Sequence, residues 1–537
     1  MRVQCRVRAV LAVAAGLLLA CGSSRPTSYE QLPRPDDAGV GLPLVYDSSD
    51  PLDCEEAKTS KSYVGCDYWP TVTPNAVWSV FDYAVVVANT GAKDASVTVT
   101  GPNGVNKQTS VPPGNLRKIY LPWVPALKGP DADACGLAGG SLASTVVPNG
   151  AYHLVSSSPV IVYQFNALQY QPVGGEGPNG SPKNWGSSPG ASCSSGAVPF
   201  FSFSNDSSLL LPSTAMTGNY RVTGYPGSAA AAPALTVTAT APNTQITLAL
   251  STSATIVRSA AGAPVEAATS GQARLTLANA GDVVQFIADF GKDFSGSLVQ
   301  SDKPVQVIAA LPCITIPSEF AACDHIEETV LPAETLGTRY VVAPPTGTKG
   351  VAVGQVVRIY GNQDATELSY VPSRPARCPE RINAGQTVDC GVVDTPFEVT
   401  GTKEFGVSTF LLGATVHNDV AGDPSQSNVA ATEQFRTAYV FLAPNDYPIL
   451  FADVTSPKDA KVEIDGAPVT EPWTPIAGST FGVYRVTLSR NGRDGAHTLS
   501  ASTPVGLQVI GYGAYTSFQY PAGLNLLRIA PPPPPLK

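Results

Sequence analysis

Short stretches in which apolar and polar residues alternate recur along most of the chain. In residues 95–100 and 235–240 every second residue is Ser or Thr. A period of two residues is typical of a β-strand with one buried and one solvent-facing side. Turn signals rich in Gly, Pro and Asn separate these stretches, and no helical period extends beyond about ten residues after the N-terminal segment. The pattern predicts an all-β protein.

The predicted strands recur at a longer period. Pro212 stands eight residues before Tyr220, and Pro332 stands eight residues before Tyr340, with each tyrosine opening a strand. Pro70 has the same relation to Trp78, while a fourth aromatic opener, Tyr439, lacks the proline. The four predicted openers are Trp78, Tyr220, Tyr340 and Tyr439.

Each copy of the repeat closes on a second theme, a strand that begins with Pro-Val. This theme occurs at residues 159–160, 304–305 and 504–505, with a weaker Glu-Phe copy at 404–405. Copies of about 100 residues suit β-sandwiches better than propeller blades of about 40 to 50 residues. The sequence therefore predicts about four tandem antiparallel β-sandwich-like repeats in one compact array, with a propeller-like ring as the alternative.

The N-terminal residues have the pattern of an export signal. Arginines at positions 2, 6 and 8 precede an apolar run at 9–20, which is shorter than the ~20 residues that span a membrane. Residues 18–21 (Leu-Leu-Ala-Cys) resemble a bacterial lipoprotein cleavage site, so Cys21 is the predicted lipidation site. An ordinary signal peptide cut nearby is the alternative. Gly22 resembles the outer-membrane sorting pattern, and we expect an outer-membrane lipoprotein, on the cell surface of a Gram-negative-type envelope or on its periplasmic face.

These signals divide the chain into eight predicted segments. They are a lipoprotein signal peptide (1–20), the lipidated cysteine with a flexible Pro/Ser-rich spacer (21–50), β unit 1 (51–170), an irregular disulfide-bearing loop (171–207), β unit 2 (208–325), β unit 3 (326–425), β unit 4 (426–525) and a Pro-rich tail (526–537) that we expect to be disordered.

Amino-acid composition narrows the possible class of protein and its possible partners further. Only 14% of the residues are charged, against about 25% in a typical globular domain, while 43% are hydrophobic, which excludes a wholly disordered chain. A net charge of −9 leaves no basic surplus to neutralise phosphates, so we exclude nucleic acid as a partner.

The cysteines point to an oxidising compartment. Of the 10 cysteines, Cys5 would leave with the signal and Cys21 would carry the lipid, so an even number remains for disulfides. The candidates are Cys54, Cys66, Cys135, Cys193, Cys313, Cys323, Cys378 and Cys390. We predict the near-neighbour pairs Cys54–Cys66, Cys313–Cys323 and Cys378–Cys390, which leave Cys135–Cys193 by elimination among 105 possible pairings.

No catalytic constellation stands out. His153 lies in an alternating strand, where a structural role is the better interpretation. His325 lies beside Asp324 and Glu327, which alone make a weak metal cluster. Residues 186–190 match GxSxG formally, but a Pro/Gly/Ser loop replaces the strand and helix that this motif needs. We therefore predict no enzyme, no cofactor and no metal.

The longest irregular stretch, residues 174–197, carries Trp185, and Tyr170 lies just before it. Aromatic residues on loops are favoured at binding surfaces, so both are candidate ligand contacts. The alternative is that Trp185 covers a junction between units beside Cys193.

Three segments, at 61–70, 151–160 and 209–220, resemble the IgGFc-binding protein N-terminal domain family. Members of that family occur in mucus-associated animal proteins and in bacterial lipoproteins. The resemblance covers roughly residues 50–520. It implies extracellular binding rather than catalysis, and it carries over no ligand-contact residue.

Together these features predict a lipid-anchored, non-catalytic binding or adhesion module of the IgGFc-binding type, with a protein or glycan as its ligand. Two alternatives stay open. One is a glycan-active envelope enzyme on a β scaffold, and the other is a purely structural periplasmic interaction protein.

Overall fold

β-strands make up most of the regular structure. The computed structural model describes residue 47 and residues 50–537, apart from 133–141, 178–180, 187–200, 229–230, 258–263, 320–322, 445, 489–494 and 537. Its α-helices are α2 (Cys54–Thr59) and α3 (Pro125–Lys128), and its 3₁₀ turns are η1 (Pro102–Gly104), η4 (Ala333–Thr335), η5 (Ala414–His417) and η6 (Thr432–Gln434). No helix in the described residues is both long and apolar enough to cross a membrane. The all-β prediction is confirmed, while the predicted signal peptide and Cys21 lie outside the described residues.

Unit 1 is a seven-stranded sheet built around the long strand β7 (His153–Asn166). Its other strands are β4 (Val105–Val111), β3 (Ala95–Gly101), β2 (Tyr83–Asn89), β5 (Leu116–Leu121), β1 (Gly65–Tyr68) and β8 (Asp206–Leu209). Every residue of β2 is buried, whereas β3 alternates between buried and exposed residues. The alternation predicted for 95–100 therefore gives a strand with one solvent-facing side, paired with β4 and β7.

Unit 2 consists of two sheets that share one apolar core. One sheet contains β16 (Asp324–Thr329), β15 (Val305–Ile314), β10 (Ala234–Ala239), β13 (Val283–Ile287) and β6 (Thr145–Val147), and the other contains β12 (Gln272–Leu277), β11 (Thr244–Ala249), β14 (Leu298–Ser301) and β9 (Asn219–Arg221). Val237 and Phe286 from the first sheet pack in the same cluster as Leu248 and Val299 from the second. The pairing of β16 with β15 runs past the predicted boundary at residue 325.

Unit 3 repeats this two-sheet arrangement. Its sheets are β17 (Arg339–Val342), β22 (Phe397–Gly401), β19 (Thr366–Val371) and β20 (Arg381–Ile382), and β21 (Thr387–Val393), β18 (Gln355–Gly361), β23 (Phe405–Phe410) and β24 (Gln426–Asn428). Tyr340 and Leu368 from one sheet share a core with Val357 and Val407 from the other. Units 2 and 3 are therefore sandwich-like, as predicted.

Unit 4 is an eight-stranded sheet around β31 (Gly495–Gly513). Its other strands are β25 (Arg436–Ala443), β26 (Ile449–Pro457), β27 (Val462–Ile464), β28 (Ala467–Pro468), β29 (Thr474–Pro475), β30 (Phe481–Thr487) and β32 (Thr516–Pro521). The first part of β31 pairs with β25 and β27, and its second part pairs with β26 and β32. The single strand β31 therefore belongs to two layers of unit 4, one with β25 and β27 and the other with β26 and β32.

A tyrosine hydroxyl ties the start of each unit to its closing strand. The tyrosines are Tyr68, Tyr220, Tyr340 and Tyr439, and they donate to the carbonyl oxygens of Val160, Val305, Phe405 and Val505, respectively. These carbonyls belong to the predicted Pro-Val and Glu-Phe segments. In unit 1 the opener is Tyr68, so the prediction of Trp78 is wrong. The Trp78 indole instead donates to the carbonyl of Ala132 at 3.2 Å.

The change Tyr340→Phe is expected to lower the free energy of unfolding by about 2 kcal/mol. The Tyr340 hydroxyl donates to the carbonyl of Phe405 at 2.6 Å and accepts from the amide of Gly337 at 2.9 Å. Losing it leaves both buried backbone groups unpaired. Urea unfolding measures the effect, with Tyr484→Phe on β30 as the control, because the Tyr484 side chain is only half-buried. Equal losses in the two variants would contradict the role given to Tyr340.

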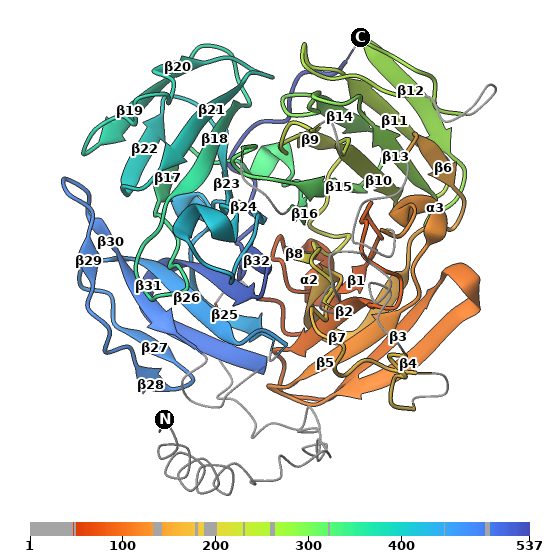
Figure 1. Ribbon diagram of the computed structural model, residues 1–537, viewed down its shortest axis with the longest axis horizontal. Helices are drawn as coiled ribbons and strands as arrows, with labels where there is room; N and C mark the ends of the chain where they lie inside the picture. The colour runs from red at the N-terminus through yellow and green to blue at the C-terminus, as the bar shows by residue number, and fades with distance from the viewer. Residues whose placement is uncertain are drawn as a thin grey trace, which may run out of the picture. The chain divides into compact units, whose positions relative to one another are not determined.

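The four units meet at their last strands, which lie around the middle of Figure 1. Strands β8, β16, β24 and β32 each pair antiparallel with the closing strand of their own unit. Strand β8 also contacts β16 and β32, and β24 contacts the same two strands. The four central strands therefore contact one another in a closed cycle, and each of them belongs to a different unit.

Segments from both ends of the described chain cross between units. Arg436 of β25 donates to the carboxylate of Asp50 at 2.6 Å, and the amide of Thr437 donates to Asp47 at 2.7 Å. At the other end, Gln300 of β14 donates to the carbonyl of Pro534 at 3.2 Å and accepts from the amide of Leu536 at 2.6 Å. The prediction of a disordered Pro-rich tail is wrong, because these contacts hold the tail on unit 2.

Candidate functional site

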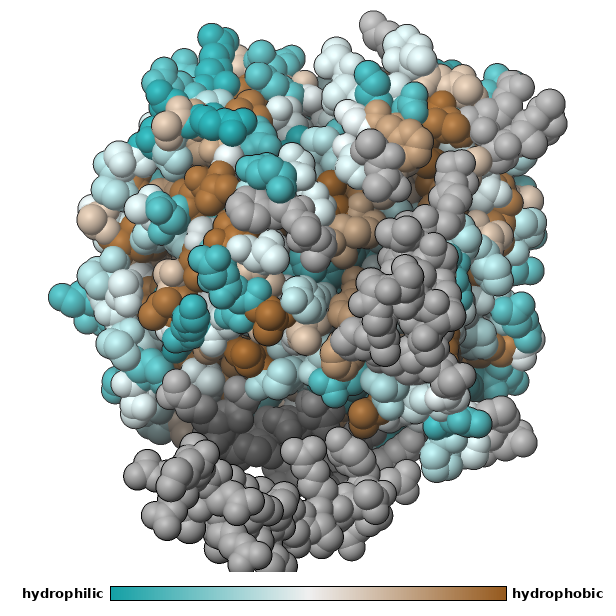
Figure 2. All heavy atoms as spheres, in the orientation of Figure 1, coloured by the Kyte–Doolittle hydropathy of each residue, from teal (hydrophilic) through white to brown (hydrophobic). Residues whose placement is uncertain are grey.

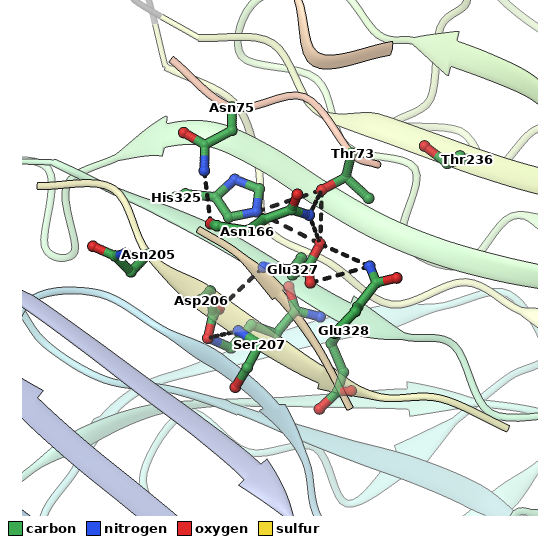
Figure 3. A network of polar contacts seen from close by, with 12 residues as sticks. Thr73, Asn75, Asn166, Asn205, Asp206, Ser207, Thr236, His325, Glu327 and Glu328 are labelled. Atoms are coloured by element: carbon green, nitrogen blue, oxygen red, sulfur yellow. Dashed lines mark hydrogen bonds and ion pairs between the residues drawn. The ribbon is translucent and has the colours of Figure 1, made fainter. Parts of the chain in front are cut away.

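The central strands carry polar side chains in the interior of the protein. We call this cluster the polar hub, and its buried members on the four strands are Asp206, Ser207, Ser208, Asp324, His325, Glu327, Glu328, Thr329, Gln426, Ser427, Asn428, Thr516, Ser517 and Gln519. Figure 3 shows part of it, with Asp206 and Glu327 on neighbouring strands. Buried polar groups cost free energy unless they are hydrogen-bonded, so their contacts decide what the hub does.

Asp206 joins three units. Its Oδ1 accepts from the hydroxyl of Ser425 at 2.8 Å and from the amide of Ser207 at 2.9 Å. Its Oδ2 accepts from the amides of Glu327 and Gln426, each at 3.0 Å. One side chain of unit 1 thus satisfies backbone donors in units 2 and 3.

Asp324 makes the corresponding contacts from unit 2. Its Oδ1 accepts from the amide of Asn205 at 2.7 Å, and its Oδ2 accepts from the hydroxyl of Thr516 at 3.0 Å. Glu328 on the same strand accepts from the amide of Asn428 at 3.2 Å. Side chains of β16 therefore reach units 1, 3 and 4, and the hub links all four units.

Burial changes the proton affinity of these carboxyl groups. Loss of contact with water raises the pKa of Asp206, Asp324 and Glu328 well above the usual range, although their hydrogen-bond donors act in the opposite direction. The charges of Asp423 and Asp206 raise the pKa of Asp324 further. Burial also raises the pKa of Asp423 to about 8. The hub therefore binds protons that an unfolded chain would release at neutral pH.

One corner of the hub has residue types that occur in catalytic sites. Glu327 accepts from the hydroxyl of Thr73 at 2.7 Å and from Asn166, and its Oε2 lies 3.7 Å from Nε2 of His325 (Figure 3). However, the side chains of His325 and Glu327 are both 0% exposed. No external substrate can reach them in this structure, and the corner joins β7 and the segment after β1 in unit 1 to β16.

The described residues contain no group of three or more His, Cys, Asp or Glu side chains placed to hold a metal ion. In the cluster noted in the sequence, the side chains of Asp324 and Glu327 instead accept the hydrogen bonds described above, and the His325 ring lies buried beside Glu327. Cys323 next to them is part of a disulfide. The arrangement holds strands together and offers no open coordination site.

Three predicted disulfides are confirmed: Cys54–Cys66, Cys313–Cys323 and Cys378–Cys390. Cys135 and Cys193, the pair predicted by elimination, lie outside the described residues, as does Cys21. The three bridges close short loops within units, so they stabilise individual units rather than the contacts between them.

The two predicted ligand contacts differ in position. Tyr170 is only 3% exposed and packs against Tyr447 of unit 4 with ring centres 5.3 Å apart, so the prediction of an exposed contact is wrong for Tyr170. Trp185 is half-buried, with its ring centre 5.2 Å from that of Phe81 and its indole donating to the carbonyl of Gly174. These contacts pack Trp185 against the core of unit 1, and Cys193, beside which the alternative placed it at a junction between units, lies outside the described residues.

Sequence reasoning noted Asp324, His325 and Glu327 but missed Asp206 and the hub residues of the other central strands. A signal was present, because a short polar segment precedes Leu-Pro in two units: Asn205–Ser208 before 209–212 and Asp324–Thr329 before 330–332. Such segments match the composition of a loop, and their burial follows only from the closed cycle of strands.

Comparison with known proteins adds a family match. The family model described as IgGFc binding protein matches residues 206–511. A human protein named IgGFc-binding protein is 27% identical over 224 residues, which is 41% of this chain and 4% of the human protein. The chain thus spans a small part of that relative's length. The match begins at Asp206, so the resembling segments at 61–70 and 151–160 lie before it.

A solved structure titled as a tetra-tandem repeat in the extending region of a large adhesion protein is 12% identical. The comparison covers 85% of this chain and 98% of that chain, with a TM-score of 0.08. A score this low carries no argument about fold or function.

Proposed function

Because this chain belongs to the IgGFc-binding protein family, whose model matches residues 206–511, we propose that it is an exported, lipid-anchored binding module without catalytic activity. Its ligand is an external protein or glycan, and its anchor is the acylated Cys21. The family membership is the observation that carries this proposal, since the name of the human relative describes binding to IgG Fc.

The structure supports a scaffold role in two ways. The most concentrated polar chemistry of the described residues lies in the hub, where it joins strands and is closed to substrates. On the face shown in Figure 2, apolar side chains lie scattered among polar ones instead of forming one large patch. A rigid scaffold with a mixed surface suits recognition of a polar partner.

Protease treatment of intact cells tests the exported location. If the proposal is right, the full-length band disappears from intact cells and from lysed cells alike. Digestion only after lysis would confine the protein to the periplasm and overturn the surface assignment.

The change Cys21→Ser is expected to move the protein from the membrane fraction to the soluble fraction, because a serine at this position cannot receive the lipid. Fractionation followed by immunoblotting measures the shift. Cys5→Ser, a change within the predicted signal peptide, is the matched control and should leave the protein in the membrane fraction. Unchanged membrane attachment of the Cys21→Ser protein would contradict the lipid anchor.

A further inference from the structure

An open hollow of about 530 Å³ lies where unit 1 meets unit 2. It is lined by Asp67, Trp69, His153, Ser213, Thr214, Thr240, Ala280 and Pro304. Its volume falls within the range of about 300 to 1,000 Å³ that is typical of small-molecule sites. Unlike the hub, this place is accessible from outside.

Two titratable side chains of the hollow are held in a fixed arrangement. The imidazole of His153, at the start of β7, stacks on the ring of Trp69 with centres 4.1 Å apart and planes 7° apart. Its Nε2 lies 2.8 Å from Oδ2 of Asp67 on β1. The His153 side chain is 34% exposed and that of Asp67 is 37% exposed, so about a third of each is open to solvent.

Hydroxyl groups surround this pair. Ser213 and Thr214 follow β8, and the amide of Ser213 donates to the carbonyl of Asp67 at 2.9 Å, which fixes the loop beside the pair. Thr240 follows β10, and its hydroxyl donates to the carbonyl of Pro304 at 2.6 Å. The oxygen of that hydroxyl keeps its capacity to accept hydrogen bonds.

The charge of the lining narrows the class of ligand. Among the described residues that line the hollow there is no Lys or Arg, and the carboxylate of Asp67 disfavours a phosphate, sulfate or carboxylate, although Nζ of Lys61 donates to the carbonyl of the lining residue Thr214 at 2.5 Å. Trp69, Ala280 and Pro304 contribute apolar surface beside the hydroxyls, and the exposed lining is more apolar than polar. An apolar surface bordered by a few hydroxyl groups and a carboxylate complements a sugar ring, which has hydroxyl groups at its edge and C–H groups on its faces.

We propose that this hollow is a binding site for an uncharged saccharide. This inference rests on the proposed function as a binding module, and it names one place and one class of ligand for it. Asp67 and His153 contact the sugar hydroxyl groups directly, and Trp69 is a positioning residue that holds the imidazole.

Isothermal titration calorimetry on the detergent-solubilised full chain tests the proposal. The probes are maltotriose, cellotriose, chitotriose and mannotriose, with 3′-sialyllactose as the anionic comparison. We expect at least one neutral trisaccharide to bind with a millimolar dissociation constant and sialyllactose to bind at least tenfold more weakly.

Two variants locate the site. Asp67→Asn removes the charge with little change in shape, and Ala280→Arg places a long side chain at the hollow without removing a hydrogen bond. Each is expected to weaken trisaccharide binding at least tenfold, whereas Asp94→Asn, an exposed position on the same unit, leaves it unchanged. Identical thermal unfolding of the Ala280→Arg and unmodified proteins guards against a folding defect.

The proposal fails if none of the four neutral trisaccharides binds at 10-millimolar concentrations (about −3 kcal/mol or weaker), or if binding survives both Asp67→Asn and Ala280→Arg. These outcomes are separate from those of the protease experiment. A protein that is protected inside intact cells can still bind a trisaccharide in calorimetry, and a surface-exposed protein can fail to do so.

Discussion

Replacing Asp206 with alanine is expected to lower the free energy of unfolding by about 4 kcal/mol or more. The carboxyl group accepts hydrogen bonds from the amides of Glu327 and Gln426 and from the hydroxyl of Ser425. These donors lie in units 2 and 3, and all of them are buried. An alanine leaves them without a partner, and each unpaired buried donor costs about 1 to 3 kcal/mol.

Urea unfolding followed by tryptophan fluorescence measures this loss. Ser207→Ala is the matched control, because the Ser207 hydroxyl on the same strand is buried and has no hydrogen-bond partner among the described residues. Its removal is expected to change stability by less than about 1 kcal/mol. If Asp206→Ala were as mild as Ser207→Ala, the hub would not hold the units together.

Stability is expected to fall as the pH rises from about 4 to about 8. Burial disfavours the charged form of Asp423 and raises its pKa from the ordinary 3.8 of an aspartate to about 8 in the folded protein. The folded protein therefore keeps a proton that the unfolded chain releases within this interval. The resulting stabilisation is fully present below pH 4 and is lost as the pH approaches 8. At roughly 1.4 kcal/mol per pKa unit, the loss amounts to several kcal/mol.

Urea unfolding at pH 4, 6 and 8 measures this slope. Asp423→Asn keeps the shape of the side chain but removes its titration, so it should make the slope shallower. The remaining slope comes from Asp206, Asp324 and Glu328, whose pKa values are raised in the same direction. Asp94→Asn is the exposed control. Equal slopes in the unmodified and Asp423→Asn proteins would show that Asp423 is ionised in the folded state.

The repeat could be predicted from sequence because its markers are local. Tyr220 and Tyr340 lie at fixed distances from a proline, and both lie in the strands that they are predicted to open. Trp78 has the same spacing but is not the opener. The Tyr220 and Tyr340 hydroxyls each donate to a carbonyl and accept from an amide, whereas an indole can only donate.

The hub could not be predicted in the same way. Asp206 and Asp324 lie 118 positions apart in the sequence, and their partners come from other units. Their role depends on the closed cycle of strands, and period-two patterns say nothing about how units are arranged. The prediction that Tyr170 is an exposed ligand contact is wrong for a related reason, because Tyr447 of unit 4 packs against its ring.

The ion pair between Asp50 and Arg436 also sets how the molecule would respond to a mechanical pull. Tension on the chain before Asp47 reaches unit 4 first, through Asp47–Thr437 and Asp50–Arg436, although the next strand in sequence belongs to unit 1. Arg436 is itself held against the ring of Tyr63 at 4.8 Å. A load applied from the N-terminal side is therefore shared across the junction of the first and last units before it can peel β1 from its sheet.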